Sequence, residues 1–169
     1  MVQVIEMTDI GNGRPSNQDA YLMRQKEYQG ETCLLAAVCD GMGGLKRGEI
    51  ASRYLIEVLK QWFDEVMPNL IKQKNMDLIR KDLIGLIRKS NQNLLLMSED
   101  IDETMGSTLT LLFAFKKRFF VLNVGDSRAY WFDQVKSKSN FVGKHLFQYD
   151  RFRYTDMPKC DDRRSHTQR

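Results

Sequence analysis

Two long helices are predicted in the middle of the chain, between two groups of short strands. Residues 49–65 and 76–97 carry apolar side chains three and four positions apart, the spacing that places them on one face of an α-helix. The segments before and after them are short runs of apolar and β-branched residues, as expected of strands. Because the helices are grouped together and do not alternate with strands, this order predicts an α+β layered fold and not a series of βαβ units.

Strands are expected on both sides of the helical region. Residues 33–39 form a continuous apolar run that ends at Asp40, which is typical of a strand buried on both faces. Lys116 and Lys117 separate two strand-like runs and predict the turn of a β-hairpin. The expected strands are residues 2–7, 20–24, 33–39, 107–115, 119–124 and 127–132.

The basic charge of the chain is confined to its last part. Residues 1–132 contain 17 basic and 17 acidic side chains, whereas residues 133–169 contain 9 basic and 5 acidic ones and hold the whole net charge of +4. Residues 133–169 also lack hydrophobic periodicity, so we expect a folded domain over residues 1–132 and a disordered basic tail after it. Since this tail mixes both signs of charge, the basic balance does not indicate nucleic-acid binding.

The cysteines and the apolar runs bear on the cellular compartment. Cys33, Cys39 and Cys160 are odd in number and are not spaced as a zinc site or a redox pair, which favours reduced thiols. No apolar run approaches the roughly 20 residues that cross a bilayer. The first residues lack the basic start and apolar run of a signal peptide. We therefore expect a cytoplasmic protein with no membrane partner.

Asp40 and Gly41 follow the apolar run directly and form the most informative local motif. A carboxylate at the end of a strand is held by a fixed backbone, and a glycine lets a ligand or another chain segment approach closely. Hard divalent cations prefer carboxylate and carbonyl oxygens, so the Asp40 side chain and the Gly41 carbonyl are candidate metal ligands. The same pair is common in ordinary turns between a strand and a helix, and the motif alone leaves both interpretations open.

Polar residues in other loops are further candidates. The Arg14 guanidinium could bind two phosphate oxygens at once, and Asp19 could orient water molecules around a metal ion. An exposed loop with an Asx turn would have a similar sequence. Gly106–Thr108 and Gly125–Arg128 are, taken singly, more typical of turns than of catalysis.

The motifs together carry a family resemblance. In order, they are Thr8-Asp9…Gly11…Arg14…Asn17-Gln18-Asp19, Asp40-Gly41-Met42-Gly43-Gly44…Gly48-Glu49…Ala51-Ser52, Gly106-Ser107-Thr108 and Gly125-Asp126-Ser127-Arg128-Ala129-Tyr130. This series closely resembles the PPM-type (type 2C) metal-dependent protein serine/threonine phosphatases, particularly their bacterial branch. The resemblance covers residues 1–132, which would be the N-terminal part of a phosphatase domain. It implies a layered sandwich of two antiparallel β-sheets flanked by helices, with two Mn²⁺ or Mg²⁺ ions between the sheets.

The resemblance also implies a role for individual residues. Asp40 would bridge the two metal ions, and the Gly41 carbonyl would bind one of them. Asp19 would hold water bound to a metal ion, and Asp126 would contribute to an additional, weaker metal site. Arg14 would clamp the substrate phosphate, so Arg14 and Asp40 are the expected catalytic residues. Water activated by the two ions would hydrolyse phosphoserine or phosphothreonine in a protein.

The resemblance is incomplete at the C-terminal end. Family members carry a later Asp-Gly segment and a final Asp-Asn whose aspartates complete the metal site, whereas the only Asp-Gly of this chain is Asp40–Gly41 and Asp-Asn does not occur. We therefore expect a truncated or frame-shifted product with poor activity or none. The alternative is a non-catalytic remnant that acts as a protein-binding module. The expected partners are a phosphorylated protein and a cognate Ser/Thr kinase, without nucleic acid, and the expected state is a monomer.

Overall fold

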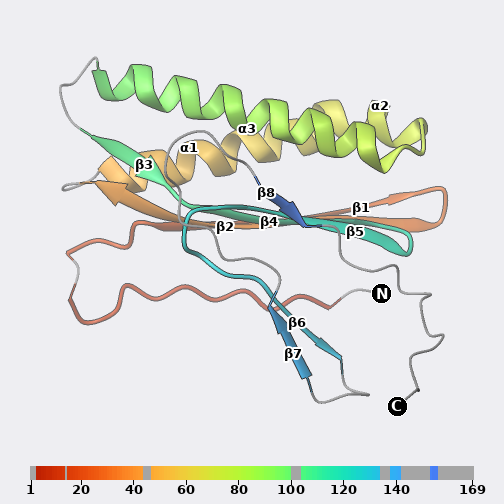
Figure 1. Ribbon diagram of the computed structural model, residues 1–169, viewed down its shortest axis with the longest axis horizontal. Helices are drawn as coiled ribbons and strands as arrows, with labels where there is room; N and C mark the ends of the chain where they lie inside the picture. The colour runs from red at the N-terminus through yellow and green to blue at the C-terminus, as the bar shows by residue number, and fades with distance from the viewer. Residues whose placement is uncertain are drawn as a thin grey trace, which may run out of the picture.

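Helices lie on one face of an antiparallel sheet, and a shorter sheet lies on the opposite side (Figure 1). The computed structural model describes residues 3–13, 15–43, 47–99, 104–133, 138–141 and 153–155, with side chains only as far as Tyr130. The strands are β1 (Asp19–Tyr28), β2 (Glu31–Gly43), β3 (Met105–Ser107), β4 (Leu109–Phe115), β5 (Arg118–Val124), β6 (Tyr130–Asp133), β7 (Lys138–Phe141) and β8 (Arg153–Thr155). The helical segments are α1 (Arg47–Gln61), η1 (Trp62–Val66), α2 (Met67–Lys72) and α3 (Met76–Glu99). This arrangement confirms the predicted α+β fold with antiparallel sheets flanked by helices.

The larger sheet has the strand order β1-β2-β4-β5-β8, and β3 pairs with β2 beyond the end of β4. All of its pairings are antiparallel. β4 and β5 form the predicted hairpin, with Lys116 at a φ of 58° in the turn. β6 and β7 form the second, separate antiparallel pair.

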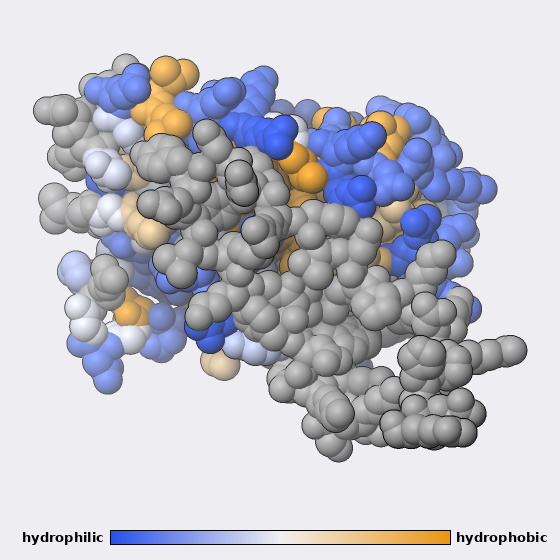
Figure 2. Space-filling model, viewed as in Figure 1, coloured by the Kyte–Doolittle hydropathy of each residue, from blue (hydrophilic) through white to orange (hydrophobic). Residues whose placement is uncertain are grey.

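The hydrophobic core lies between the larger sheet and the helices. Alternate β2 residues, among them Leu35 and Ala37, are buried in one cluster with Leu55 of α1 and Leu83 of α3. Within it the Phe113 ring stacks on Phe120 at a centroid distance of 5.4 Å. Burial of each large apolar side chain contributes about 1.5–3 kcal/mol to folding. The outer surface of the helices is mostly hydrophilic, as Figure 2 shows, which matches the amphipathic pattern that predicted them.

The first predicted helix is interrupted. Residues 47–61 are α-helical, but Trp62–Val66 form a π-helical turn, and the chain then continues as α2. The wider turn lets the adjacent side chains of Trp62 and Phe63 both enter the core, where the Trp62 indole N–H donates to the Asp82 carboxylate over 2.6 Å. Pro68 lies in the first turn of α2, where a missing backbone N–H costs no helical hydrogen bond. The second predicted helix is confirmed as α3.

One prediction about strands is wrong, and another holds only in part. Residues 3–7 pair with no described strand and are exposed, although Figure 1 shows the segment running along the side of the larger sheet away from the helices. The segment lies over the face of the sheet, where it lines a groove with residues of β1, β2 and β4, and not beside the edge strand β1, so its backbone has no strand to pair with. The second concerns β2, where the face opposite the helices is buried only in part, since Leu34 is 6% exposed and Val38 is 50% exposed.

Strands β7 and β8 lie within residues 133–169, where the sequence pattern predicted none, and β8 pairs with β5. The division of the chain at residue 133 stays a prediction.

Candidate functional site

Asp19 and Asp40 face each other at one end of the larger sheet. Asp19 opens β1, and the antiparallel register pairs it directly with Asp40 of β2. Directly opposed residues project to the same face, with their Cβ atoms about 4.5–5.5 Å apart. Both residues are exposed. Two like charges in this position repel each other, so the pair favours a cation held between the two carboxylates, directly or through water.

The backbone around Asp40 is held by the segment between β3 and β4. The Thr108 N–H donates to the Asp40 carbonyl over 2.9 Å, and the Ser107 hydroxyl lies within hydrogen-bond distance of the same carbonyl, at 3.1 Å, and of the Thr108 carbonyl, at 2.8 Å. In return, the Asp40 N–H donates to the Thr108 hydroxyl over 2.9 Å. These bonds fix the position from which the Asp40 carboxylate leaves the sheet.

Gly41 lies where two backbone segments come very close. A Cβ atom on Gly41 would be 2.1 Å from the Gly48 carbonyl oxygen, and one on Gly48 would be 2.6 Å from the Gly41 carbonyl carbon. The Gly41 N–H donates to the Gln18 carbonyl over 3.1 Å, and the buried Ser52 hydroxyl donates to the same carbonyl over 2.7 Å. The start of α1 is thus packed directly onto the strand ends that carry Asp19 and Asp40.

Asp126 lies in the turn that follows β5. Its neighbour Gly125 has a φ of 99°, and its other neighbour, Ser127, has its hydroxyl 2.8 Å from the Thr108 hydroxyl. Since Thr108 also bonds to the backbone of Asp40, the Asp126 turn and Asp40 belong to the same end of the sheet.

Arg14 lies outside the described residues. The described residues beside it form local turns, in which the Gly11 N–H donates to the Asp9 carboxylate over 2.7 Å. The Asp19 N–H donates to the Asn17 side-chain oxygen over 3.0 Å. These contacts support the predicted Asx-type loop geometry next to Asp19.

The comparisons with known proteins agree on one family. A sequence model described as protein phosphatase 2C matches residues 9–164. The chain belongs to the protein phosphatase 2C family. The serine/threonine phosphatase stp of Listeria welshimeri is 28% identical over 157 residues, which cover 91% of this chain and 59% of that protein. The serine/threonine protein phosphatase PstP of Mycobacterium tuberculosis is 32% identical over 126 residues, which cover 73% of this chain and 21% of that protein.

Solved structures of the family share the fold. A crystal structure of a bacterial serine phosphatase matches with a TM-score of 0.67 at 30% identity, over 82% of this chain and 53% of that one. The catalytic domain of PstP in complex with two manganese ions matches with a TM-score of 0.59 at 29% identity, over 79% of this chain and 51% of that one. The chain therefore spans about half the length of these family structures. The predicted resemblance to the bacterial branch of type 2C phosphatases is confirmed.

The metal-binding capacity of the described residues rests on Asp19 and Asp40. No group of three or more His, Cys, Asp and Glu side chains comes together in the part of the chain that the structure describes. Two opposed carboxylates nevertheless suit a hard divalent cation, which prefers oxygen ligands. The donor chemistry of this family member thus fits a magnesium or manganese ion better than a soft metal.

The family motif also contains residues whose importance the sequence alone did not explain. Gly48 and Ser52 belong to the quoted motif, but only the structure shows that they pack α1 onto the Asp19–Asp40 strand ends. Thr108 and Ser127 belong to segments whose sequence is typical of turns, and the structure shows that their hydroxyls contact each other near Asp40. The sequence pattern does not indicate these contacts, because the long-range hydrogen bonds of Ser52 and Thr108 join residues 19 to 68 positions apart and the contact of Gly48 with Gly41 depends on how α1 turns back onto β2.

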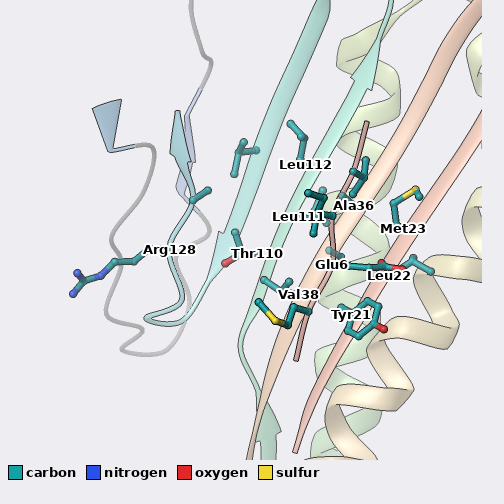
Figure 3. Close-up of a pocket in the computed structure, with 16 residues that line it drawn as sticks. Glu6, Tyr21, Leu22, Met23, Ala36, Val38, Thr110, Leu111, Leu112 and Arg128 are labelled. Carbon is teal, nitrogen blue, oxygen red and sulfur yellow. The ribbon is translucent and has the colours of Figure 1, made fainter. Parts of the chain in front are cut away.

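A groove of about 320 Å³ runs along the sheet face opposite the helices. Figure 3 shows Tyr21, Met23 and Val38 on its sheet side, with the Arg128 guanidinium pointing away from it. Residues 4–7 form part of its other wall. The lining is largely apolar, so the groove suits packing of protein segments more than binding of a charged substrate.

The buried cysteines are not candidates for a nucleophile. Burial raises the pKa of the Cys33 and Cys39 thiols to about 12, although a hydrogen bond with Ser107 acts in the opposite direction at Cys39. Both thiols are therefore protonated at neutral pH.

No helix in the described ranges has the length and hydropathy that a membrane span requires.

Proposed function

We propose that the Asp19–Asp40 end of the sheet serves the metal-dependent hydrolysis of phosphoserine and phosphothreonine in proteins. The observation that carries this proposal is the direct cross-strand pairing of the two carboxylates. Two directly opposed negative charges repel each other, and a divalent cation held between them offsets that repulsion. The family relatives named serine/threonine phosphatases support the reaction class.

Two Mn²⁺ or Mg²⁺ ions are the proposed cofactors, which the two manganese ions in the PstP structure support. When bound, such ions lower the pKa of a water molecule and neutralise charge on the phosphoryl oxygens. We assign Asp40 as the bridging ligand and the Gly41 carbonyl as a second ligand, because Asp40 is fixed through its backbone. Asp19 would orient water from the opposite strand, and Asp126 would contribute to an additional metal site.

The proposed substrate is a phosphorylated protein, and a cognate Ser/Thr kinase is a candidate partner. We expect a monomer. The two free buried thiols, Cys33 and Cys39, are in keeping with the prediction of a reducing, cytoplasmic compartment.

The proposal can be tested with a chimera that joins this chain to the remaining segment of the Listeria welshimeri phosphatase. With Mn²⁺, this chimera should hydrolyse a phosphothreonine peptide, and Asp40→Asn should remove that activity. Asp64→Asn is the matched control, since Asp64 is exposed and its contact with Arg24 is 3.9 Å long. By itself the chain should hydrolyse the phosphopeptide poorly. The two negative charges of Asp19 and Asp40 balance only part of the positive charge of two divalent cations. Equal activity of the Asp40→Asn and Asp64→Asn chimeras would contradict the proposed site.

Arg14→Ala in the same chimera should lower kcat/KM for the phosphopeptide by about 10- to 100-fold, the value of a charged, two-pronged contact with phosphate. Its Mn²⁺ affinity should stay unchanged, because a guanidinium does not bind a cation. Steady-state kinetics and a calorimetric Mn²⁺ titration measure the two quantities separately. A variant that loses Mn²⁺ affinity and keeps its kcat/KM would assign Arg14 a different role.

A further inference from the structure

The hydrogen bonding between β2 and the β3–β4 segment is irregular at Asp40. β3 and β4 pair with β2 in one continuous register, in which Gly41 opposes Ser107 and Val38 opposes Thr110. This register places Thr108 opposite Asp40. A regular antiparallel pair would exchange two backbone hydrogen bonds, each from an N–H to a carbonyl. Here the Asp40 N–H donates to the Thr108 side-chain hydroxyl, while the Thr108 N–H donates to the Asp40 carbonyl.

The Thr108 side chain also contacts the turn that carries Asp126. Its hydroxyl lies 2.8 Å from the Ser127 hydroxyl, and a hydroxyl can accept the Asp40 N–H and still bond to Ser127. Its methyl group lies against Gly125, since a Cβ atom there would be 2.7 Å from it. Asp126 is therefore flanked on both sides by residues in contact with Thr108.

A second set of hydrogen bonds holds the same turn at Gly125, where it leaves β5. The buried Thr110 hydroxyl donates to the side-chain oxygen of buried Asn123, whose amide group donates to the Gly125 carbonyl over 3.2 Å. The turn is thus held at Gly125 and at Ser127, with Asp126 between them. Thr108 itself is 1% exposed, so its hydrogen bonds are shielded from water.

We propose that Thr108 is a positioning residue that couples Asp40 to the Asp126 turn, so that the two carboxylates keep one fixed arrangement. One hydroxyl group joins β2 to the turn after β5, and a displacement of either segment would strain the same hydrogen bonds. The expected effect of this coupling on Mn²⁺ affinity rests on the proposed metal-dependent function. The coupling of the two segments does not depend on that function.

Thr108→Val and Thr108→Ser form a matched pair of variants. Valine keeps the branched shape and the methyl contact with Gly125 but removes the hydroxyl, whereas serine keeps the hydroxyl and removes the methyl group. Hydrogen exchange followed by mass spectrometry on the metal-free chain should be faster in Thr108→Val over both residues 38–43 and residues 124–130. Mn²⁺ affinity, measured by calorimetry, should fall about three- to tenfold in the same variant. Thr108→Ser should keep slow exchange and Mn²⁺ affinity within about twofold of the parent chain.

The exchange rates of these variants distinguish coupling through the Thr108 hydroxyl from a packing effect of its side chain, and they do so whether or not the proposed function is correct. Faster exchange in only one of the two segments would overturn the coupling, and so would a Thr108→Ser variant that behaves like Thr108→Val. If Thr108→Val does not fold, Ser127→Ala replaces it, and faster exchange over residues 38–43 is then the expected result; unchanged exchange there overturns the inference. If Asp40→Asn leaves Mn²⁺ affinity unchanged, the proposed metal site fails, and the exchange data still decide whether Thr108 couples the two segments.

Discussion

Gly41→Ala should destabilise the chain by at least about 3 kcal/mol, because the new methyl group would overlap the backbone of another segment. The added Cβ atom would be 2.1 Å from the Gly48 carbonyl oxygen and 2.7 Å from the Gln18 carbonyl oxygen. Neither atom can rotate away as a flexible side chain could. Relief therefore requires the start of α1 to move off the end of β2. The free energy of unfolding from urea denaturation measures the effect.

Gly85→Ala is the matched control for this substitution. Gly85 lies in the middle of α3, is exposed, and has no atom within 4 Å of the position of an added Cβ. Alanine there should stabilise the chain by about 0.5–1 kcal/mol, because glycine is a poor helix former. Gly48→Ala should resemble Gly41→Ala, since its Cβ would be 2.6 Å from the Gly41 carbonyl carbon. If Gly41→Ala and Gly85→Ala have similar stabilities, the close backbone crossing is not real.

The parts of the fold that the sequence predicted are those governed by local periodicity. The apolar positions of residues 76–97 repeat at helical spacing, and α3 covers Met76–Glu99. The Lys116–Lys117 turn follows from two apolar runs with a short polar interval, and β4 and β5 form that hairpin. The predicted strand at residues 2–7 was wrong because alternation describes a strand's faces but says nothing about an edge with which to pair.

The features of the candidate site also fall into two groups, those that the sequence could predict and those that only the structure reveals. Asp40 and Gly41 could be singled out because a strand-like run ends at them, and Asp19 because it belongs to the polar Asn17-Gln18-Asp19 motif just before the predicted strand at residues 20–24. The direct opposition of Asp19 and Asp40 depends on strand register, which the two-residue turn at Gln29 and Gly30 sets and which the polar run over residues 25–32 did not locate. The contact of Gly41 with Gly48 depends on how α1 turns back onto the end of β2, and that of Thr108 with Ser127 depends on how the turn after β5 packs against β4. Such contacts could be identified only in three dimensions.

Mn²⁺ should raise the melting temperature of the chain, and Asp40→Asn should remove that effect. A ligand that binds only the folded state at a free concentration of 100 times Kd stabilises it by about 2.7 kcal/mol. For a chain of this size, that corresponds to an increase of roughly 5–10 °C. Loss of the Asp40 carboxylate leaves Asp19 alone at the paired position, so affinity should fall at least about a hundredfold and the increase should disappear. Thermal unfolding with and without Mn²⁺ measures both quantities.

Asp19→Asn and Asp64→Asn complete the comparison and separate a metal site from a general charge effect. Asp19→Asn should weaken the Mn²⁺-induced shift less than Asp40→Asn, because Asp19 is assigned to orient water and not to bind the ion directly. In the metal-free chain it should leave stability unchanged or raise it by up to about 1 kcal/mol, since it removes a like-charge pair across β1 and β2. Asp64→Asn should keep the full shift, because Asp64 lies in the π-helical turn η1. If all three variants respond to Mn²⁺ like the parent chain, the ion binds elsewhere, and the opposed carboxylates do not hold it either directly or through water.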